Sequence, residues 1–529
     1  MYKLTNLKLP IDFDKNNIKK YLSDKLKINT SSISYCELDK LSIDAREKSN
    51  IHYVANILFG VNVKLNLSKY KNISLYSPPK KEIKKWHGGD KKIVIVGSGP
   101  SGLFAGLELC NSGANVTIIE RGYEMDKRIS VVERLMNDGV LDEKSNIQFG
   151  EGGAGTFSDG KLNTGTKSGY NSQVLDTFCQ FGASKEILYT NRPHVGTDVL
   201  SKVIVNIREY MKSKGSTFLF EYKLVGINNS NGVDSIIVET PDGEISMPCD
   251  ILILAIGHSS RDTIRNLNSN GISFKQKAFS LGYRIEHLQK DIDYSQYGEV
   301  SFRGILPPAD YHLATHLENG RVVYTFCMCP GGVVVPATSE NGHVVTNGMS
   351  YSKRDGVNAN SAILVSVTPE DFPSTHSLSG IDLQEEIESK AYSKNNSFLA
   401  TVQRVGDFLD GVKTTKLGKV FPTYKPGFEL GSVEDILPYN LTTSLKQGII
   451  ALDSNLKGFA DTDAILTGVE TRSSAPYQVI RKDNMETDIP NVYMVGEGAG
   501  FAGGIVSSAV EGIKVANILL DKYNISDKK

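Results

Sequence analysis

The sequence has almost no excess charge and no long apolar run. Its 529 residues include 59 lysines and arginines against 60 aspartates and glutamates, a net charge of -1. Such a chain is not drawn as a whole to nucleic acid or anionic lipid. No apolar run reaches membrane-spanning length, and MYKLTNLKLPIDFDKNN places charges where a signal peptide needs its apolar segment. We therefore expect a cytoplasmic protein without a membrane partner.

Cysteine is also scarce, because the chain has only six and they show no regular spacing. This pattern predicts free thiols in a reducing compartment rather than a disulfide framework. Only Cys327 and Cys329 lie close together, in the stretch CMCPGG. Zinc needs three or four ligands, and no second close Cys or His pair completes the set, so we predict no metal site.

A glycine-rich turn is the clearest motif that is present. KKIVIVGSGPSGLFAGLELCNSGANVTIIERG predicts a buried strand, a tight turn, a helix and a second strand that ends in an acid. Gly97 permits the turn, Gly99 lets the backbone approach a pyrophosphate, and Gly102 lets the helix pack against the strand. Glu120 stands where a carboxylate accepts hydrogen bonds from an adenosine ribose. The motif predicts a dinucleotide site; the alternative is a turn used only for packing.

Two later segments favour FAD over NAD. ILILAIGHS (251–259) is an apolar strand before a small-residue turn, and VYMVGEGAGFAGG is a further strand and glycine turn. Together the three segments resemble the FAD-binding fold of the glutathione-reductase type. That resemblance implies that Glu497, which replaces the more common Asp, reaches the ribityl chain of the flavin. The loop EGGAGTFSDGKLNT (151–164) offers backbone N–H groups and the cation of Lys161, so we predict flavin contact there rather than a flexible surface loop.

Motifs along nearly the whole chain strongly resemble one bacterial family. They are GEGGAGTFSDGKL, AIGHSSRDT, FSLGYRIEHLQ, YTFCMCPGGVVVPATSE, NGMSYSKRDGVNANSAILVSV, GVETRSSAP and GEGAGFAGGIVSSA. The family is that of predicted FAD-dependent dehydrogenases, or NAD(P)/FAD-dependent oxidoreductases, with a small N-terminal α+β domain, and it is itself poorly characterised. The resemblance implies an α/β fold and FAD as cofactor, and it supplies no substrate.

The chain is longer than one core normally sustains, so we expect several domains. Residues 1–75 are predicted to form a small βαββ unit, and residues 76–90, rich in Pro, Lys and Gly, a linker. Residues 91–277 and 441–529 are expected to form the two parts of a Rossmann-like FAD-binding domain. Residues 278–440, with short strands and many turns, are expected to form an inserted β-rich substrate or cap domain.

The motifs and the resemblance together predict a set of cofactor-binding residues. These are Gly97, Gly99, Pro100, Ser101, Gly102, Glu120, Arg121, Arg128, Gly153, Thr156, Lys161, Leu224, Ala255, Gly257, His258, Gly496, Glu497, Gly503, Gly504 and Ile505. Leu224 is expected to touch the adenine through its backbone. His258 follows the AIG turn and is interpreted as a cofactor or helix-start contact rather than as a catalytic acid.

Four residues are candidates for catalysis: Lys161, Cys327, Cys329 and Arg472. Arg472 either holds a substrate carboxylate or pairs with Glu470 or Glu497. Three interpretations stay open for the cysteines, namely a loop that lines the flavin pocket with one functional thiol, packing only, or a redox pair. We favour the first. The Pro-Gly-Gly turn predicts a sharp reversal, so we expect CMCPGG to close over the flavin ring without an obligatory disulfide.

These predictions lead to a cytoplasmic FAD-dependent oxidoreductase that moves a hydride through flavin N5 to or from a small organic substrate. Only one strand–glycine–helix fingerprint with its acid is present, so we expect no dedicated NADH or NADPH site. The alternative is an RNA-binding or RNA-modifying flavoprotein. Residues 1–90 carry 17 basic and 9 acidic residues, a charge of +8. Their aromatic residues are ordinary for strands, which makes nucleic acid the less favoured partner.

Overall fold

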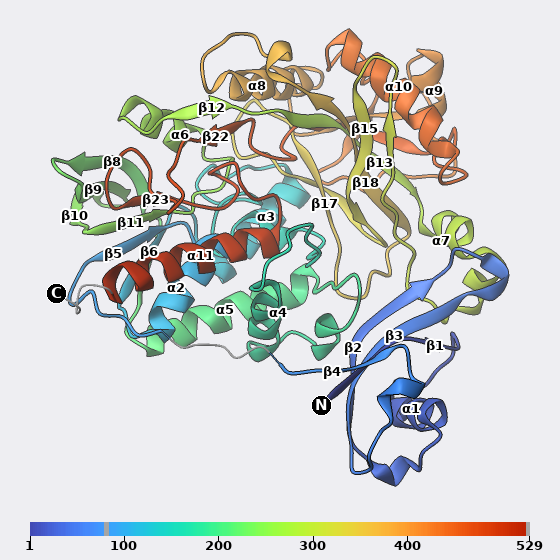
Figure 1. Ribbon diagram of the computed structural model, residues 1–529. Coiled ribbons are helices and arrows are strands. Elements are labelled where there is room, and N and C mark those ends of the chain that lie inside the picture. The colour runs from blue at the N-terminus through green and yellow to red at the C-terminus, as the bar shows by residue number, and fades with distance from the viewer. Residues whose placement is uncertain (79–83, 525–529) are drawn as a thin grey trace.

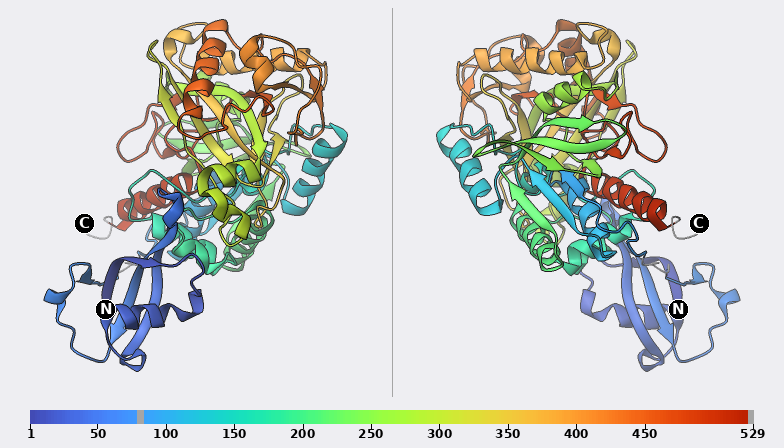
Figure 2. Two further views of the ribbon diagram at one scale, coloured as in Figure 1. Left: turned by 90° about the vertical axis from the view of Figure 1, so that its right-hand side faces the viewer. Right: turned by 90° about the vertical axis from the view of Figure 1, so that its left-hand side faces the viewer.

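The computed structural model describes residues 1–78 and 84–524, so residues 79–83 of the predicted linker lie outside the described residues. The N-terminal elements form a unit that projects from the rest of the molecule (Figures 1 and 2). Its sheet has the order β2-β3-β1-β4. The elements are β1 (Tyr2–Leu9), α1 (Ile18–Leu26), β2 (Ile33–Asp44), β3 (His52–Val61) and β4 (Ile73–Leu75). The predicted βαββ unit is confirmed, and β4 adds a strand at the free edge of β1.

A five-stranded parallel sheet of order β23-β11-β5-β6-β7 lies at the centre of the remaining chain. Its strands are β5 (Ile93–Val96), β6 (Val116–Glu120), β7 (Thr217–Phe220), β11 (Ile251–Leu254) and β23 (Val492–Met494). They come from three distant stretches of sequence. This arrangement confirms the predicted α/β fold of discontinuous segments.

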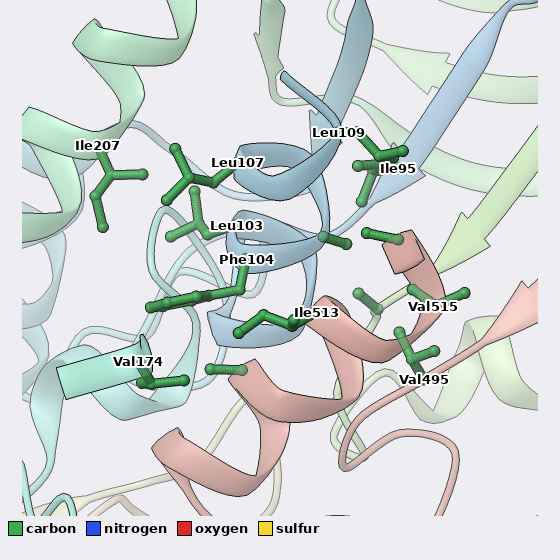
Figure 3. Close-up of a cluster of buried hydrophobic side chains, with 14 of the residues drawn as sticks. Ile95, Leu103, Phe104, Leu107, Leu109, Val174, Ile207, Val495, Ile513 and Val515 are labelled. Atoms are coloured by element: carbon green, nitrogen blue, oxygen red, sulfur yellow. The ribbon is translucent and has the colours of Figure 1, made fainter. Parts of the chain in front are cut away.

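Alternate residues of this sheet face two different layers, as the two-residue period of a strand requires. Ile93 and Ile95 pack against helices, whereas Val94 and Val96 face a small antiparallel sheet. The helices on the first face are α2 (Pro100–Asn111), α4 (Asn171–Gln180), α5 (Thr197–Ser213) and α11 (Ile505–Asn524). The small sheet contains β8 (Lys223–Asn229), β9 (Val233–Thr240) and β10 (Gly243–Pro248). Figure 3 shows Phe104 of α2 and Ile513 of α11 in the first core, where α2 and α11 pack closely.

A seven-stranded sheet of order β14-β15-β18-β13-β21-β19-β20 forms the second large layer. Its strands are β13 (Phe279–Leu288), β14 (Ala314–His316), β15 (Val322–Cys329), β18 (Asn358–Val367), β19 (Ala400–Arg404), β20 (Phe428–Leu430) and β21 (Ile465–Glu470). Two short pairs accompany it, β12 (Phe274–Gln276) with β22 (Tyr477–Val479) and β16 (Val333–Pro336) with β17 (Thr346–Met349).

This region also contains helices that the expectation of short strands and turns missed. They are α7 (Gln289–Tyr297), α8 (Ser379–Ser393), α9 (Val405–Asp410) and α10 (Tyr439–Asp453). In addition, β21 pairs with β13 and β19, although it lies after residue 440. The predicted boundary at residue 440 therefore falls inside the stretch that builds this sheet. Two further helices are α3 (Met125–Asp138) and α6 (Arg261–Ser269). Val132 of α3 packs with Val335 of β16, and Ile264 of α6 packs with Val94 of the central sheet.

The N-terminal unit contacts both large layers. The backbone N–H of Leu41 donates to Tyr189, and the N–H of Asn191 donates back to Leu41. Ile51 is buried in the core of the seven-stranded layer together with Tyr297. The unit is therefore anchored by hydrogen bonds and by apolar contacts. Among the described residues, no helix is long and apolar enough to cross a membrane.

Candidate functional site

The glycine turn between β5 and α2 is shaped by contacts that leave no room for side chains at two of its glycines. Gly97 has φ +103°, and a Cβ there would lie 2.3 Å from the carbonyl oxygen of Ala255. A Cβ on Gly102 would lie 1.9 Å from the carbonyl oxygen of Gly97. At Gly99, by contrast, the nearest atom to an added Cβ is the Cα of Gly153, at 3.7 Å. The space in front of Gly99 is thus open, as close approach of a ligand to the backbone requires.

Glu120, at the end of β6, is held by four hydrogen bonds. One carboxylate oxygen accepts from the backbone N–H (2.9 Å) and the hydroxyl (2.8 Å) of Ser98. The other accepts from the backbone N–H groups of Gly122 and Gly150, both at 3.0 Å. The side chain also lines the cavity described below. Glu120 therefore ties the glycine turn to the loop after α3, and its contact with a ribose stays a prediction.

Arg121 stands beside Glu120 and shapes the end of the cavity near Leu224. Its guanidinium donates to both oxygens of Asp262, at 2.9 and 3.2 Å. The same group lies 4.1 Å from the ring centroid of Phe149. The charge of Arg121 is thus compensated by Asp262, and its planar group covers an aromatic ring.

Arg128, predicted to contact the cofactor, has a different role. It is fully buried and absent from the cavity wall. Burial lowers its pKa to about 10. Its guanidinium donates to the backbone carbonyls of Asn146, Ile147, Gly150, Glu151 and Gly153. These carbonyls all belong to the loop after α3, so Arg128 holds that loop in position. The predicted contact of Arg128 with the cofactor is therefore corrected, because its N–H groups are occupied and it lies outside the cavity wall.

A single cavity of about 670 Å³ collects most of the predicted site residues. The predicted residues in its wall are Gly97, Gly99, Pro100, Ser101, Glu120, Arg121, Gly153, Lys161, Leu224, Ala255, Gly257, His258, Cys327, Arg472, Glu497, Gly503, Gly504 and Ile505. Outside the wall lie Gly102, Arg128, Thr156, Cys329 and Gly496. A Cβ on Gly496 would lie 2.1 Å from the hydroxyl of Ser101, so this glycine permits close packing under the cavity.

His258 and Glu497 form a polar pair in the cavity wall. Nδ1 of His258 lies 3.5 Å from Oε1 of Glu497. His258 is only 7 % exposed, and its Nε2 has no hydrogen-bond partner among the described residues. A buried ring nitrogen without a partner is costly, so this atom marks a place where a ligand can accept or donate a hydrogen bond.

Cys327 lies at a backbone irregularity at the end of β15. The pairing with β18 shifts between Phe326 and Cys329, and Cys327 has φ +43°. A bulge of this kind redirects a side chain, and strained backbone of this type clusters at functional sites. Cys327 lines the cavity, whereas Cys329 is fully buried beside it. CMCPGG is therefore a strand end with a bulge that continues into the Pro330 turn, rather than a free loop.

Arg284 of β13 holds this strand end. It is fully buried, donates to the carbonyl of Cys327, and lies 3.1 Å from Sγ of Cys329. Its Nη1 donates to both carboxylate oxygens of Glu470, at 3.0 and 3.2 Å, and its Nε donates to Asn360 at 2.8 Å. One cation thus serves a carboxylate and a cysteine pair.

The pKa values of Cys327, Cys329 and Glu470 are all shifted from their ordinary values. The hydrogen bond with Cys329, helped by the charges of Arg284 and Lys161, lowers the pKa of Cys327 to about 6. Burial raises the pKa of Cys329. Burial also raises the pKa of Glu470 to about 7, and the negative charge of Cys327 acts in the same direction. All six cysteines are free in the structure.

Lys161, in the loop after α3, lines the cavity beside the cysteine strand. Its Nζ donates to the carbonyl of Met328 and lies 3.7 Å from Asp159. Asp159 is fully buried and accepts from Arg354 at 2.8 Å. Lys161 therefore connects the loop 151–164 to the cysteine strand and leaves its charge beside the thiol.

Arg472 lines the cavity, but its ion-pair partner is neither of the two residues expected from the sequence. It pairs with Glu388 of α8, at 2.8 Å and 3.1 Å, and not with Glu470 or Glu497. Arg261 of α6 donates to the same carboxylate, at 2.7 and 2.9 Å. The paired charges lower the pKa of Glu388 despite its burial. The expected pairing is corrected because α8, 84 residues upstream, brings the carboxylate to Arg472.

Several wall residues were missed by reasoning from the sequence. Glu470 was considered only as a partner of Arg472, and Asp159 was not considered although it lies two residues before Lys161. Tyr311 and Thr325 also line the cavity. Only Asp159 carried a usable signal, namely its place in the glycine-rich loop.

The comparisons with known proteins agree with this geometry. A protein of Clostridium beijerinckii described as uncharacterized is 44 % identical over 536 residues, which cover 99 % of each chain. Residues 278–473 match the family model "FAD-dependent protein, C-terminal domain-like", and residues 90–128 match "FAD binding domain". The chain belongs to this family of FAD-dependent proteins. Residues 1–59 match a domain of unknown function.

Solved structures show a more distant likeness to this FAD-dependent protein. One is CtdE in complex with FAD, with 12 % identity, 83 % of this chain and 89 % of that chain covered, and a TM-score of 0.33. Another is a geranylgeranyl bacteriochlorophyll reductase-like protein from Thermoplasma acidophilum, with 12 % identity, 82 % and 80 % coverage, and a TM-score of 0.36. Similarity at this level says nothing about the reaction.

The cavity fits FAD, which is the cofactor of this protein. The open face of Gly99 and the start of α2 offer backbone N–H groups to a pyrophosphate. A Cβ on Gly503 would meet no atom within 4 Å, so the turn before α11 also leaves open space. His258, with its unpartnered Nε2, follows β11, which lies between β5 and β23, the strands that precede these two turns.

Proposed function

We propose that this FAD-dependent protein is an oxidoreductase that moves a hydride between flavin N5 and a small organic substrate. It either desaturates the substrate or reduces an activated double bond. The observation that supports this most is one continuous cavity from the glycine turn at Gly99 to Cys327 and Lys161. When bound, FAD supplies the hydride chemistry, so the protein needs only to position a substrate and move one proton.

The proposal assigns different parts of the wall to different tasks. Gly97, Gly99 and the start of α2 hold the pyrophosphate, and Arg121 and Leu224 border the adenine. The His258–Glu497 pair faces the middle of the cofactor. This assignment leaves the end of the cavity bordered by Lys161, Cys327 and Arg472 for the substrate.

Arg472 and Lys161 are already compensated by carboxylates, and this supports an uncharged or weakly charged substrate rather than a dianion. A thiol with a lowered pKa at the cavity wall supports proton transfer by Cys327. Cys329 lies behind it and acts only through it. The proposal also includes a cytoplasmic location, which the six free cysteines support.

The test is anaerobic reduction of the purified holoprotein, followed by reoxidation with a metabolite panel at the flavin absorbance band. We expect one chemical class to reoxidise the protein-bound flavin at least about tenfold faster than it reoxidises free reduced FAD, because binding positions the reactants. Cys327→Ser serves as a matched variant that keeps the cofactor site. The same panel is mixed with the oxidised holoprotein, because a substrate that is desaturated reduces the flavin. A flavin that no reductant reduces, or a panel that neither reoxidises nor reduces the bound flavin faster than free FAD, would refute the proposal.

A further inference from the structure

The cavity opens to solvent beside its substrate end. The exposed wall residues there, which we call the rim, are Asn163, Gly165, Arg192 and His312. Lys161 lies two residues before the rim, lines the same wall and donates to the carbonyl of Met328, next to Cys327. The rim is therefore adjacent to the part of the cavity that the proposed function leaves for the substrate.

Backbone pairing and one ion pair bring the rim residues together. The N–H of Leu162 donates to the carbonyl of Pro193 at 3.0 Å, in antiparallel register. The same register places Asn163 opposite Arg192. Nη1 of Arg192 donates to Asp310, in the segment before β14. The rim is thus a single site to which both large layers contribute.

The N-terminal unit holds the chain beside the rim. The N–H of Asn191 donates to the carbonyl of Leu41 in β2 at 2.8 Å. Ile51, just before β3, packs with Tyr297 of α7, and Figure 1 shows the ends of β2 and β3 beside this helix. The backbone next to Arg192 is therefore fixed by contacts that need no ligand.

Arg192 differs from the other arginines of the cavity wall in its free donors. Arg121 and Arg472 each engage both terminal nitrogens with side chains. Arg192 donates only from Nη1, so its Nε and Nη2 have no partner among residues 1–78 and 84–524. Its side chain is 48 % exposed. One edge of this guanidinium therefore remains open, with two N–H groups that point the same way.

An open guanidinium edge of this kind matches a carboxylate, whose two oxygens accept the two N–H groups side by side. Asn163 and His312 stand at the same rim, and neither side chain has a partner in the described part of the chain. Asp310 already gives Arg192 one negative partner, so a second monoanion is accommodated more easily than a dianion.

We propose that Arg192 binds the carboxylate of a monocarboxylic substrate at the rim and so selects the substrate. The rest of the molecule then extends past Lys161 toward Cys327. This inference rests on the proposed function, because it treats the cavity as a substrate site. Only the carboxylate end is charged, and it stays at the rim. The reacting part is uncharged, in agreement with the compensated charges of Lys161 and Arg472.

The first measurement needs no turnover. Oxidised holoprotein is titrated by calorimetry with benzoate, cinnamate and octanoate, and with the primary amide of each, which has nearly the same shape and no charge. We expect at least one acid to bind about tenfold or more tightly than its amide, because a charge-assisted bidentate pair distinguishes them. Equal binding of every acid and its amide, or no acid binding at millimolar concentration, would overturn the proposal.

Arg192→Gln tests whether the open edge produces this preference. It should reduce the preference to about twofold or less and leave the Kd of the amide unchanged. The substitution also leaves Asp310 without its cation, so the double variant Arg192→Gln/Asp310→Asn is measured beside it. We expect no recovery in the double variant, because the guanidinium is still missing. A full preference in folded Arg192→Gln protein, or its return in the double variant, would contradict the proposed site.

Two further variants separate the site from net charge. Arg134→Gln is the matched control, because Arg134 is exposed, carries the same charge and lies outside the cavity wall. It should keep the full preference. Arg192→Lys keeps the charge without the paired N–H groups and should keep only part of the preference. An equal loss in Arg134→Gln and Arg192→Gln would assign the effect to net charge and refute the site. Thermal unfolding of each variant checks that it is folded.

Turnover separates this proposal from the proposed function. The substrate found by the reoxidation panel should be a carboxylate, and Arg192→Gln should raise its KM about tenfold with kcat nearly unchanged, because Arg192 binds the end away from the reacting atoms. Acid binding at the rim without any reactive panel member would refute the proposed function, and with it the role of the acid as substrate. A reactive substrate without a carboxylate, or a KM unchanged by Arg192→Gln, would refute the selection by Arg192 alone.

Discussion

Gly99 and Gly102 lie three residues apart in the same turn, yet the structure predicts opposite consequences for their substitution. Gly99 has φ -70° and ψ -179°, which any residue adopts, and an added Cβ would meet only the Cα of Gly153 at 3.7 Å. Gly99→Val should therefore fold. Gly102→Ala places its Cβ 1.9 Å from a carbonyl oxygen, so α2 must shift away from β5.

The expected loss of FAD affinity in Gly99→Val follows from the hydrogen bonds at stake. The isopropyl group fills the space in front of the turn and keeps a phosphate from the backbone N–H groups. Hydrogen bonds to a charged partner contribute about 1.5–3 kcal/mol each, and about 1.4 kcal/mol corresponds to a tenfold change in Kd. Losing two such bonds raises Kd by about 100-fold or more.

The assay is titration of apoprotein with FAD by flavin fluorescence, together with thermal unfolding of the apoprotein. Gly169→Val is the matched control, because a Cβ there would meet no atom within 4 Å and the residue lies outside the cavity. We expect Gly99→Val to keep the wild-type apoprotein Tm and lose affinity, and Gly102→Ala to lower Tm. Wild-type FAD affinity in Gly99→Val would show that the pyrophosphate does not lie at this turn.

Three further predictions concern other parts of the structure. Glu388→Gln leaves Arg261 and Arg472 with Glu340 as their remaining shared carboxylate, at 2.9 and 3.7 Å, and should destabilise the fold by about 3 kcal/mol at pH 7. Because the folded-state pKa of Glu388 is depressed, its contribution is present above the unfolded pKa of about 4.3 and is lost as pH falls toward the folded value. Urea unfolding of the wild type and the variant should therefore show a smaller difference in the free energy of unfolding at pH 3 than at pH 7. An equal difference at the two pH values would contradict this prediction. Stopped-flow mixing with NADPH should show no rapid saturable reduction of the flavin; micromolar affinity would reveal a nicotinamide site. Thiol counting on the denatured, non-reduced protein should give six free thiols, and four would indicate a disulfide in the native protein.

The order of the central elements could be predicted from sequence because each carries its own local signal. The strand before Gly97 and the helix after it follow from an apolar run, a glycine turn and small residues. Leu7 and Leu9 of β1 are buried in the alternating pattern that predicts a half-buried strand, and a bulge between Leu4 and Leu7 lets Leu4 be buried as well. Local periodicity is sufficient for these elements.

The substrate end could be predicted only in part, because its geometry depends on contacts between distant segments. Arg472 meets Glu388, and Arg284 meets Glu470, across 84 and 186 residues of sequence. No spacing rule connects such pairs. Likewise, the bulge at Cys327 results from pairing with β18, which a single strand pattern does not reveal. The sequence indicated which residues are able to carry out acid–base or redox chemistry, but not which of them form ion pairs with each other.

The attachment of the N-terminal unit bears on how the protein can be shortened. Deleting residues 1–75 removes Leu41 from its backbone bonds of 2.6 and 2.8 Å with the segment 189–191, and leaves the carbonyl of Tyr189 and the N–H of Asn191 on that chain edge unpaired. It also withdraws Ile51 from the core that contains Tyr297 and exposes apolar surface there. Arg192, next to that freed edge, lines the cavity. A shortened chain would therefore expose aggregation-prone surface beside its own cavity. A loss of activity in that chain would then reflect aggregation as much as the loss of any functional residue.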